Sequence, residues 1–334
     1  VILFNLGGPD KLENVEPFLF NLFNDPAIIS VPSIFRYPLA KFISKRRAPI
    51  AKNIYREIGN KSPILELTQD QAKSLENNLL EKGDYKCFIV MRCWRPRASD
   101  VIKKVREYNP EEIILLPLYP QFSASTSGSS INEWNKICKK ENYKVKTKTI
   151  CCYPTENNFI ESHISLIKKA LKILENNNFK LIFSAHGLPE NKIKNGDPYQ
   201  WQVEATVKAI MSKMKNENLD YTISYQSRVG PLKWIGPSTE EVIIKYSKEK
   251  RGIVIVPIAF VSEHSETLVE LDIEYKKLAK KNGCNFYKRV PALGIEENFI
   301  KGLTELVLQK QTKGNFVSSV MCPNKYIKCP CLGL

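Results

Sequence analysis

The sequence predicts an α/β protein of two domains, each a parallel sheet flanked by helices, with a cleft between them. Short apolar runs of strand length recur along the chain, most clearly at residues 252–260, which read GIVIVPIAF. A segment with helical periodicity follows almost every run, and this alternation favours parallel strands covered by helices on both faces. With 334 residues, 43% of them hydrophobic, the chain is long enough for two domains with sizeable cores.

In the first half, apolar runs and periodic segments alternate. Strands are expected at residues 1–6, 86–91, 112–118 and 144–153, and helices at residues 15–23, 65–82, 98–108, from 131 onward and 159–174. The first strand ends in Gly7-Gly8-Pro9, a turn that lets the backbone approach another group closely. Because neither GxGxxG nor GK[ST] is present, this turn does not predict a nucleotide site.

A distinct stretch, which we call the lip, covers residues 28–47 and reads IISVPSIFRYPLAKFISKRR. One side of it is apolar and aromatic, Pro32 and Pro38 interrupt it, and it ends in three consecutive cations. The pattern fits a surface that rests on a lipid interface, with Arg and Lys at the level of the head groups. It fits an ordinary pair of core-facing helices equally well.

The second half repeats the alternation and carries two of the three histidines of the chain. Strands are expected at residues 181–185, 221–226, 252–260 and 284–289, and helices at residues 199–215, 239–248, 265–281 and 296–310. His186 directly follows the first of these strands, and His264 lies in the turn after the third. Open α/β sheets bind ligands at the carboxyl ends of their strands, so both imidazoles are expected at one site that faces the cleft.

Three glutamates follow His264 at helical spacing. Glu266, Glu270 and Glu274 stand at i, i+4 and i+8, so they share one face of the expected helix. Like charges at this spacing repel by about 0.2–0.5 kcal/mol per pair in a surface helix. The row therefore indicates either a solvated surface or a path for cations, and the neighbouring His264 favours the path.

Composition limits the partners and the compartment. The formal net charge is +15 and the pI is about 9.3, which suits an acidic membrane surface or nucleic acid. No helix-turn-helix, RNP or zinc-finger pattern is present, so no nucleic-acid partner is expected. The longest apolar run, residues 253–261, is well short of the roughly 20 residues that cross a bilayer, and no signal peptide is visible. Nine cysteines without secretory context indicate free thiols in a reducing, cytoplasmic compartment.

Seven groups of motifs, in one order along nearly the whole chain, carry a family resemblance. They are NLGGP (5–9), KRRAP (45–49) with Tyr55 and SPI (62–64), LYPQ (118–121) with TSGSS (126–130), FSAH (183–186), GDPY (196–199), YQSRVGP (225–231) with Trp234, and PIAFVSEHSETL (257–268). By these motifs the chain resembles the ferrochelatases, lyases that insert ferrous iron into protoporphyrin IX in the last step of haem biosynthesis. The resemblance implies two Rossmann-like domains, Fe(II) as a substrate, and no cofactor required for the chemistry.

The resemblance also implies roles for the residues singled out above. His186 and Glu266 are expected to face each other across the porphyrin and to form the iron site, and a neutral imidazole suits proton abstraction near pH 7. Glu270 and Glu274 would extend the row of carboxylates as a route for protons or metal, with His264 supporting the site. Incomplete ligation suits an enzyme that must pass the metal on.

The porphyrin needs polar partners for its propionates and an apolar slot for its rings. In the resemblance, Arg46, Tyr55 and Ser62 occupy the propionate side, where the planar fork of Arg suits a carboxylate. The slot is expected to be lined by Leu6, Ile28, Phe260 and Trp234, because flat hydrophobic ligands bind in apolar sites.

Two parts of the chain depart from the common pattern. Residues 91–96 read MRCWRP where the family usually has MRYWHP, so the family's Tyr and His roles are in doubt at Cys93 and Arg95. The tail has C-x6-C-x-C spacing and resembles the tail of bacterial ferrochelatases that bind a [2Fe–2S] cluster. The implied ligands are Cys322, Cys329, Cys331 and one interior cysteine, for which we take Cys151 with Cys152 as the alternative. Soft thiolates also suit zinc, and a loose tail of reduced thiols is the remaining alternative.

The predicted organisation is therefore a first domain at 1–155 with the lip, a second domain at 156–312 with the metal site, and a cysteine-containing tail at 313–334. The predicted partners are protoporphyrin IX, ferrous iron and the inner membrane surface, to which the cytoplasmic protein would bind peripherally. Two alternatives are a related chelatase that acts on coproporphyrin or inserts cobalt into sirohydrochlorin, and a porphyrin or haem carrier without catalytic activity. A carrier would not need the row of glutamates.

Overall fold

The computed structural model describes residues 1–174, 178–228, 230, 232–309, 315–319 and 322–332. Parts of three predicted segments lie outside these residues: 310 of the last helix, 229 and 231 of the YQSRVGP motif, and 313, 314, 320, 321, 333 and 334 of the tail. The chain divides into two compact units. Of the described residues, unit 1 contains those in 1–151 and 303–318, and unit 2 contains those in 152–302 and 319–332.

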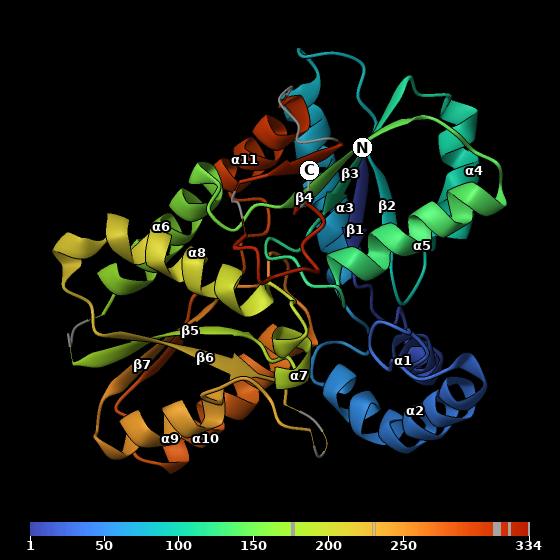
Figure 1. Cartoon of the computed structure of the whole chain (residues 1–334). Helices are drawn as coiled ribbons and strands as arrows, with labels where there is room; N and C mark the ends of the chain where they lie inside the picture. Colours follow the sequence, from blue (N-terminus) through green and yellow to red (C-terminus); the bar gives the residue numbers. More distant parts are fainter. Residues whose placement is uncertain (175–177, 229, 231, 310–314, 320–321, 333–334) are drawn as a thin grey trace. The chain divides into compact units, whose positions relative to one another are not determined.

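Unit 1 is built on a five-stranded sheet (Figure 1). Its strands, in the order β2-β1-β3-β4-β9, are Phe88–Met91, Ile2–Asn5, Glu112–Pro117, Lys146–Cys152 and Phe316–Ser318. The pairs β1–β2, β1–β3 and β3–β4 are parallel. Its helices are α1 (Val15–Phe23), α2 (Ser33–Arg56), α3 (Ile64–Leu79), α4 (Ala98–Tyr108) and α5 (Ser127–Lys140), after a short 3₁₀ turn at Leu12–Asn14.

The alternation along β1 explains how helices cover both faces of this sheet. Ile2 and Phe4 point into one apolar core with residues of α4 and α5, where the Phe4 ring packs edge-on against Trp134. Asn5 belongs to the other face, where its Nδ2 donates to Thr68 Oγ1 of α3 at 3.0 Å.

Unit 2 is built on a four-stranded parallel sheet in the order β6-β5-β7-β8. Its strands are β5 (Phe179–His186), β6 (Tyr221–Gln226), β7 (Gly252–Pro257) and β8 (Tyr287–Arg289). Its helices are α6 (Asn157–Lys172), α7 (Glu190–Lys194), α8 (Tyr199–Lys213), α9 (Thr239–Lys248), the π-helix Glu266–Glu274 and α10 (Tyr275–Lys281), with a 3₁₀ turn at Lys215–Glu217. Figure 1 shows α6 and α8 on one face of this sheet and α9 and α10 on the other. Helix α11 (Glu297–Leu308) begins in unit 2 and ends in unit 1.

The predicted fold class is confirmed, since both sheets are flanked by helices and their described pairs are parallel. Helix α7 and strand β9 were not predicted, and several predicted elements differ in extent or type. Helix α2 continues through Pro38 and Pro49 to Arg56, and Pro49 lies on its exposed side. Strand β7 ends at Pro257, three residues before Phe260. The residues that follow β7 form a π-helix before the α-helix begins.

Candidate active site

A histidine and a glutamate are in direct contact at the carboxyl edge of the sheet in unit 2. His186 is the last residue of β5, and its Nδ1 lies 2.9 Å from Oε2 of Glu266, the first residue of the π-helix. His264 Nε2 lies 3.6 Å from the same carboxylate oxygen. The sequence predicted this set of three residues, but it placed His186 and Glu266 on opposite sides of a ring. In the structure the two side chains are hydrogen-bonded to each other, and their placement relative to a bound porphyrin stays a prediction.

The direction of this hydrogen bond follows from electrostatics. Burial raises the pKa of Glu266, but the charge and hydrogen bond of His186, together with His264, outweigh burial and hold that pKa well below its ordinary value. An ionised carboxylate only accepts hydrogen bonds, so His186 Nδ1 carries the hydrogen and donates it. The other ring nitrogen, Nε2, has no hydrogen-bond partner among the described residues, and the side chain is 38% exposed.

The carboxylate also changes how readily His186 takes up a proton. Burial lowers the pKa of His186, but the charge and hydrogen bond of Glu266 and the charge of Glu270 outweigh burial and raise it above its ordinary value. Glu266 therefore stabilises the imidazolium that forms when the neutral ring takes up a proton, as a base at this position requires.

Glu270 has the opposite shift. Burial and the charge of Glu266 raise its pKa, although three hydrogen-bonding neighbours oppose the rise. Ser227 donates to it from its backbone N at 2.9 Å and from Oγ at 2.5 Å, Gln226 Nε2 donates at 3.0 Å, and the Tyr275 hydroxyl lies at 2.9 Å. Two carboxylates near one site with pKa values moved apart are typical of a site that divides roles between them.

The turn before the π-helix is held by its own hydrogen bonds. His264 N donates to Thr267 Oγ1 at 3.0 Å, and Thr267 N donates to His264 O at 3.1 Å. Glu263 accepts from Arg289 Nη1 at 2.8 Å, and the same Arg289 binds both oxygens of Asp272 at 2.7 and 2.8 Å. Arg289 thus ties the turn to the helix that carries Glu266 and Glu270. Runs of π-helix are rare and occur frequently at functional sites.

Phe260 and Trp234, the two predicted slot residues of unit 2, lie beside the histidines. The rings of Phe260 and His264 are 4.8 Å apart between centroids and tilted by 43°. Trp234 packs against Gly187, where an added Cβ would lie 3.2 Å from the Trp234 ring and 3.0 Å from Gln226 O. Glycine after His186 therefore allows the indole to approach the site closely.

The predicted porphyrin residues of unit 1 have different surroundings. Arg46 is exposed on α2, whereas Tyr55 is only 6% exposed and belongs, with the partly buried Leu6, to an apolar cluster. Ser62 is also buried, and its backbone N donates to Pro9 O at 2.8 Å. An added Cβ on Gly8 would lie 2.4 Å from Ser62, so only glycine fits in this turn. The structure thus gives Tyr55, Leu6 and Ser62 packing roles in unit 1, and no described contact tests their binding roles.

The tail cysteines are buried within unit 2. The sulfur atoms of Cys329 and Cys331 lie within 4.8 Å of each other. Gln202 Nε2 of α8 donates to Cys322 Sγ at 3.2 Å and to Cys152 Sγ at 3.3 Å. A hydrogen bond with Cys329, followed by burial, raises the pKa of the Cys322 thiol. Cys151, the preceding residue of β4, is fully buried in unit 1.

Other tail residues are packed as well. Lys328 N donates to Gly196 O at 3.1 Å, and the Tyr326 ring lies 5.9 Å from Trp201 of α8. An added Cβ on Gly196 would lie 2.6 Å from Ile327, so glycine permits this close approach. The described part of the tail is therefore an ordered part of unit 2.

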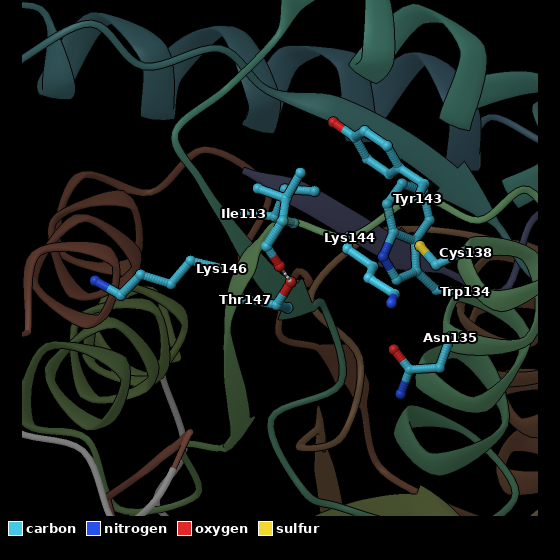
Figure 2. A pocket seen from close by; sticks show the side chains of 9 residues that line it. Ile113, Trp134, Asn135, Cys138, Tyr143, Lys144, Lys146 and Thr147 are labelled. Carbon is cyan, nitrogen blue, oxygen red and sulfur yellow. Dashed lines mark hydrogen bonds between the residues drawn. The ribbon is translucent and has the colours of Figure 1, made fainter.

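A cavity of about 440 Å³ lies in unit 1 beside the start of β4, and none of its lining residues is a predicted site residue. It is lined by Ile113, Trp134, Asn135, Cys138, Tyr143, Lys144, Val145, Lys146 and Thr147. Figure 2 shows the Lys146 side chain turned away from Trp134 and Cys138. Within the described residues the Tyr143 hydroxyl has no hydrogen-bond partner, and the two lysines of the lining are exposed. These groups do not form a convergent set, so we assign the cavity no part in the chemistry.

The sequence did not single out four residues that support the site. Gln226 and Ser227 bind Glu270, and Tyr275 joins Glu270 to Glu240. Gln226 and Ser227 lie in the YQSRVGP motif at the end of a strand, and this position could have predicted their place at the site. Tyr275 has the spacing of an ordinary core aromatic, and its role depends on the wider turn of the π-helix.

Comparisons with known proteins show the family of the chain. The ferrochelatase family model matches residues 1–311. The chain belongs to the ferrochelatase family. It is 65% identical to the ferrochelatase of Pelagibacter ubique over 99% of this chain and 98% of that protein, and 50% identical to that of Rickettsia felis over 99% and 97%. A solved structure described as SirB from Bacillus subtilis with Fe3+ has a TM-score of 0.53 at 15% identity, covering 72% of this chain and 88% of that one, which supports the fold alone.

Membership in the ferrochelatase family confirms the family predicted from the motifs. It also confirms the predicted enzyme class, a lyase that inserts metal into a porphyrin. Among the described residues, no helix has both the length and the apolar character needed to cross a membrane.

Proposed function

We propose that the chain inserts Fe(II) into protoporphyrin IX to form protohaem, with the chemistry at the carboxyl edge of the sheet in unit 2. The His186–Glu266 hydrogen bond of 2.9 Å carries the proposal. Because Nδ1 donates to Glu266, the neutral ring presents the lone pair of Nε2 at its exposed side. A substrate N–H that approaches this side meets a base whose protonated form is already stabilised.

Metal insertion exchanges two pyrrole protons for one ferrous ion. His186 Nε2 takes a proton, and Glu266 stabilises the resulting imidazolium. Glu266 stays ionised because of its low pKa, so it also supplies negative charge for the incoming cation. Glu270, whose pKa is raised, is the better carboxylate to accept a proton.

The remaining predicted residues complete the proposed substrate site. Phe260 and Trp234 supply apolar surface beside the histidines of unit 2. We assign the propionate side to Arg46, Tyr55 and Ser62, with Leu6 in the slot, as the family resemblance implies. A structure with bound porphyrin would test these assignments.

Purified protein tests the activity directly. With protoporphyrin IX and Zn(II) in place of Fe(II), we expect time-dependent loss of porphyrin fluorescence, and anaerobic Fe(II) should give the haem spectrum. Glu266→Gln should abolish both signals while porphyrin still binds. A carrier would bind porphyrin without metallating it, and turnover with coproporphyrin or sirohydrochlorin alone would identify a different chelatase.

A [2Fe–2S] cluster is the second part of the proposal. Cys322, Cys329 and Cys331 are buried, soft donors of the kind that Fe–S clusters require, and the packed tail holds them in unit 2. The hydrogen bond with Cys329 and burial raise the pKa of Cys322, and a bound metal would offset this by stabilising the thiolate. The Cys151–Cys152 pair supplies the fourth ligand. The cluster would serve structure or redox sensing.

The visible spectrum of anaerobically purified protein tests the cluster. We expect charge-transfer bands, with two iron and two sulfide per chain, and loss of both in Cys331→Ser. Cys138→Ser, which changes a cysteine of unit 1 outside this group, should keep them. Comparison of Cys151→Ser with Cys152→Ser identifies the fourth ligand. A colourless protein with one zinc, or with no metal, would contradict the assignment.

Peripheral binding of the cytoplasmic protein to the inner membrane surface is the third part. Ile34, Phe35 and Phe42 of the lip are 76%, 66% and 62% exposed on α2. Exposed apolar side chains in such a group mark interaction sites, and the cations that follow suit anionic head groups.

A further inference from the structure

The hydroxyl of Tyr275 lies between two carboxylates that come from different helices. It is 2.9 Å from Glu270 Oε1 and 3.0 Å from Glu240 Oε1 in the first turn of α9. Its ring is 3% exposed and packs in the core with Ile243 and Leu271. A phenol carries one hydrogen and cannot donate it to both carboxylates at once. The three groups therefore form a hydrogen-bonded line that runs from Glu270 of the π-helix to Glu240 of α9.

The other partners of Glu270 cannot extend this line. Gln226 Nε2 and the backbone N of Ser227 only donate, and neither can pass a proton on. Ser227 Oγ lies on the other carboxylate oxygen, Oε2. The Ser227 hydroxyl could also pass a proton, but no hydrogen bond joins it to a second acid within the described residues. Tyr275 is thus the partner of Glu270 that can both accept a proton and release one to a second acid.

The line also differs from the one that the row of glutamates predicts. Glu274, the next carboxylate in that row, is exposed, and no hydrogen bond or ion pair joins it to Glu270 within the described part of the chain. Glu240 is half-buried in the first turn of α9, so its carboxylate is in reach of solvent. It is therefore a suitable acceptor at the outer end.

We propose that Tyr275 and Glu240 form a relay that carries protons from Glu270 to the surface during metal insertion. This inference rests on the proposed function, in which the site must discharge two protons per metal ion. In each transfer, a proton on Glu270 Oε1 passes to the Tyr275 oxygen as the phenolic hydrogen passes to Glu240 Oε1. Glu270 is then ionised again, Tyr275 is neutral, and Glu240 releases the proton to solvent. Rotation of the phenolic hydrogen back toward Glu240 resets the relay.

Kinetics of Tyr275→Phe and Glu240→Gln test the relay with protoporphyrin IX and Zn(II). Tyr275→Phe removes one oxygen and keeps the ring in the core. We expect kcat to fall at least about tenfold, with the KM for porphyrin and for zinc changed less than about twofold, because the relay acts after binding. The solvent deuterium isotope effect on kcat should increase. The double variant should lose no more than either single variant, since both act on one path.

Tyr287→Phe is the matched control. The Tyr287 hydroxyl also contacts the π-helix, donating to Leu271 O at 2.6 Å, but no hydrogen bond links it to a carboxylate in the part of the chain that the structure describes. Its loss should leave kcat and the isotope effect unchanged. Wild-type kcat in Tyr275→Phe, or slowing in Glu274→Gln without slowing in Glu240→Gln, would overturn the relay while leaving the proposed function intact. An inactive wild-type protein would instead overturn the proposed function.

Discussion

At the scale of single residues, Glu266 and Glu270 have the same side chain and lie in one helix, yet their pKa values move in opposite directions. Burial raises the pKa of both. Glu266 has two imidazoles beside it that reverse the effect, whereas Glu270 has neutral donors and the negative charge of Glu266. The difference in role is therefore set by the neighbours that the fold supplies to each.

The His186–Glu266 pair predicts a measurable change in titration. Because the charge of Glu266 raises the pKa of His186 against the effect of burial, Glu266→Gln should lower it. With three histidines in the chain, NMR of the ring protons can follow each one against pH. The pKa of His163, which depends on burial, should stay unchanged and serves as the control. An unchanged pKa of His186 in Glu266→Gln would contradict the electrostatic account.

His163 predicts loss of stability in acid. It is 2% exposed, both ring nitrogens lack hydrogen-bond partners within the described residues, and burial lowers its pKa from 6.5 to about 3. As the pH falls below 6.5, the unfolded state binds a proton that the folded state does not, so this residue favours unfolding increasingly down to about pH 3. The cost is about 1.4 kcal/mol per pH unit.

The substitution His163→Leu tests this. The free energy of unfolding of the variant, relative to wild type, should rise by about 1.4 kcal/mol for each pH unit below 6.5. Urea unfolding at pH 7.5, 6 and 5 measures it. Parallel pH profiles for the two proteins would show that His163 is charged or solvated in the folded state.

At the scale of elements, α9 depends on its N-terminus, which also positions Glu240. Ser238 Oγ accepts from Glu241 N at 3.2 Å, and the Glu241 carboxylate accepts from Ser238 N at 3.0 Å. Ser238→Ala should lower the free energy of unfolding by about 1 kcal/mol, because a helix N–H loses its partner. Urea unfolding checks this, with Ser238→Thr, which keeps a capping oxygen, as the control. Equal stability of Ser238→Ala and wild type would contradict the role of the cap.

The elements also show what sequence patterns can predict. The strands β1, β2, β3, β5 and β7 were predicted from apolar runs, because buried parallel strands are nearly continuous in apolar residues. The more polar β4, β6 and β8 were predicted from their place in the alternation of strands and helices. Strand β9 has three residues, too few to be predicted from an apolar run. The full length of α2 was not predicted, because prolines interrupt its sequence pattern. The π-helix was predicted only as a helix, since the spacing of Glu266 and Glu270 is compatible with either kind of turn.

At the scale of the molecule, the net charge of +15 and the exposed lip predict two separable contributions to membrane binding. Anionic vesicles should bind the protein, and raising the salt from about 0.1 M to about 1 M should weaken binding by shortening the Debye length from about 10 Å to about 3 Å. Phe35→Asp with Phe42→Asp should abolish the salt-resistant part. The control is Leu80→Asp, which changes a leucine that is 72% exposed at the C-terminal end of α3, outside the lip. Equal vesicle binding by the lip variant and wild type would contradict this part of the proposal.

Contacts between residues far apart in the chain are the part of the site that could not be predicted from the sequence. His186, His264, Glu266 and Glu270 were all identified from strand ends and motifs. The direct bond between His186 and Glu266 joins residues 80 positions apart and depends on the packing of β5 beside β7. The same holds for Tyr275 and Glu240, and for Gln202 between Cys152 and Cys322.

The most direct test of the central claim is anaerobic Fe(II) insertion by His186→Ala, with porphyrin binding measured on the same sample. If Nε2 of His186 takes the pyrrole proton, insertion should be abolished while porphyrin binds with near wild-type affinity. His163→Leu at pH 7.5 should retain activity, since its ring lies in the core of unit 2. Wild-type turnover in His186→Ala would contradict the account.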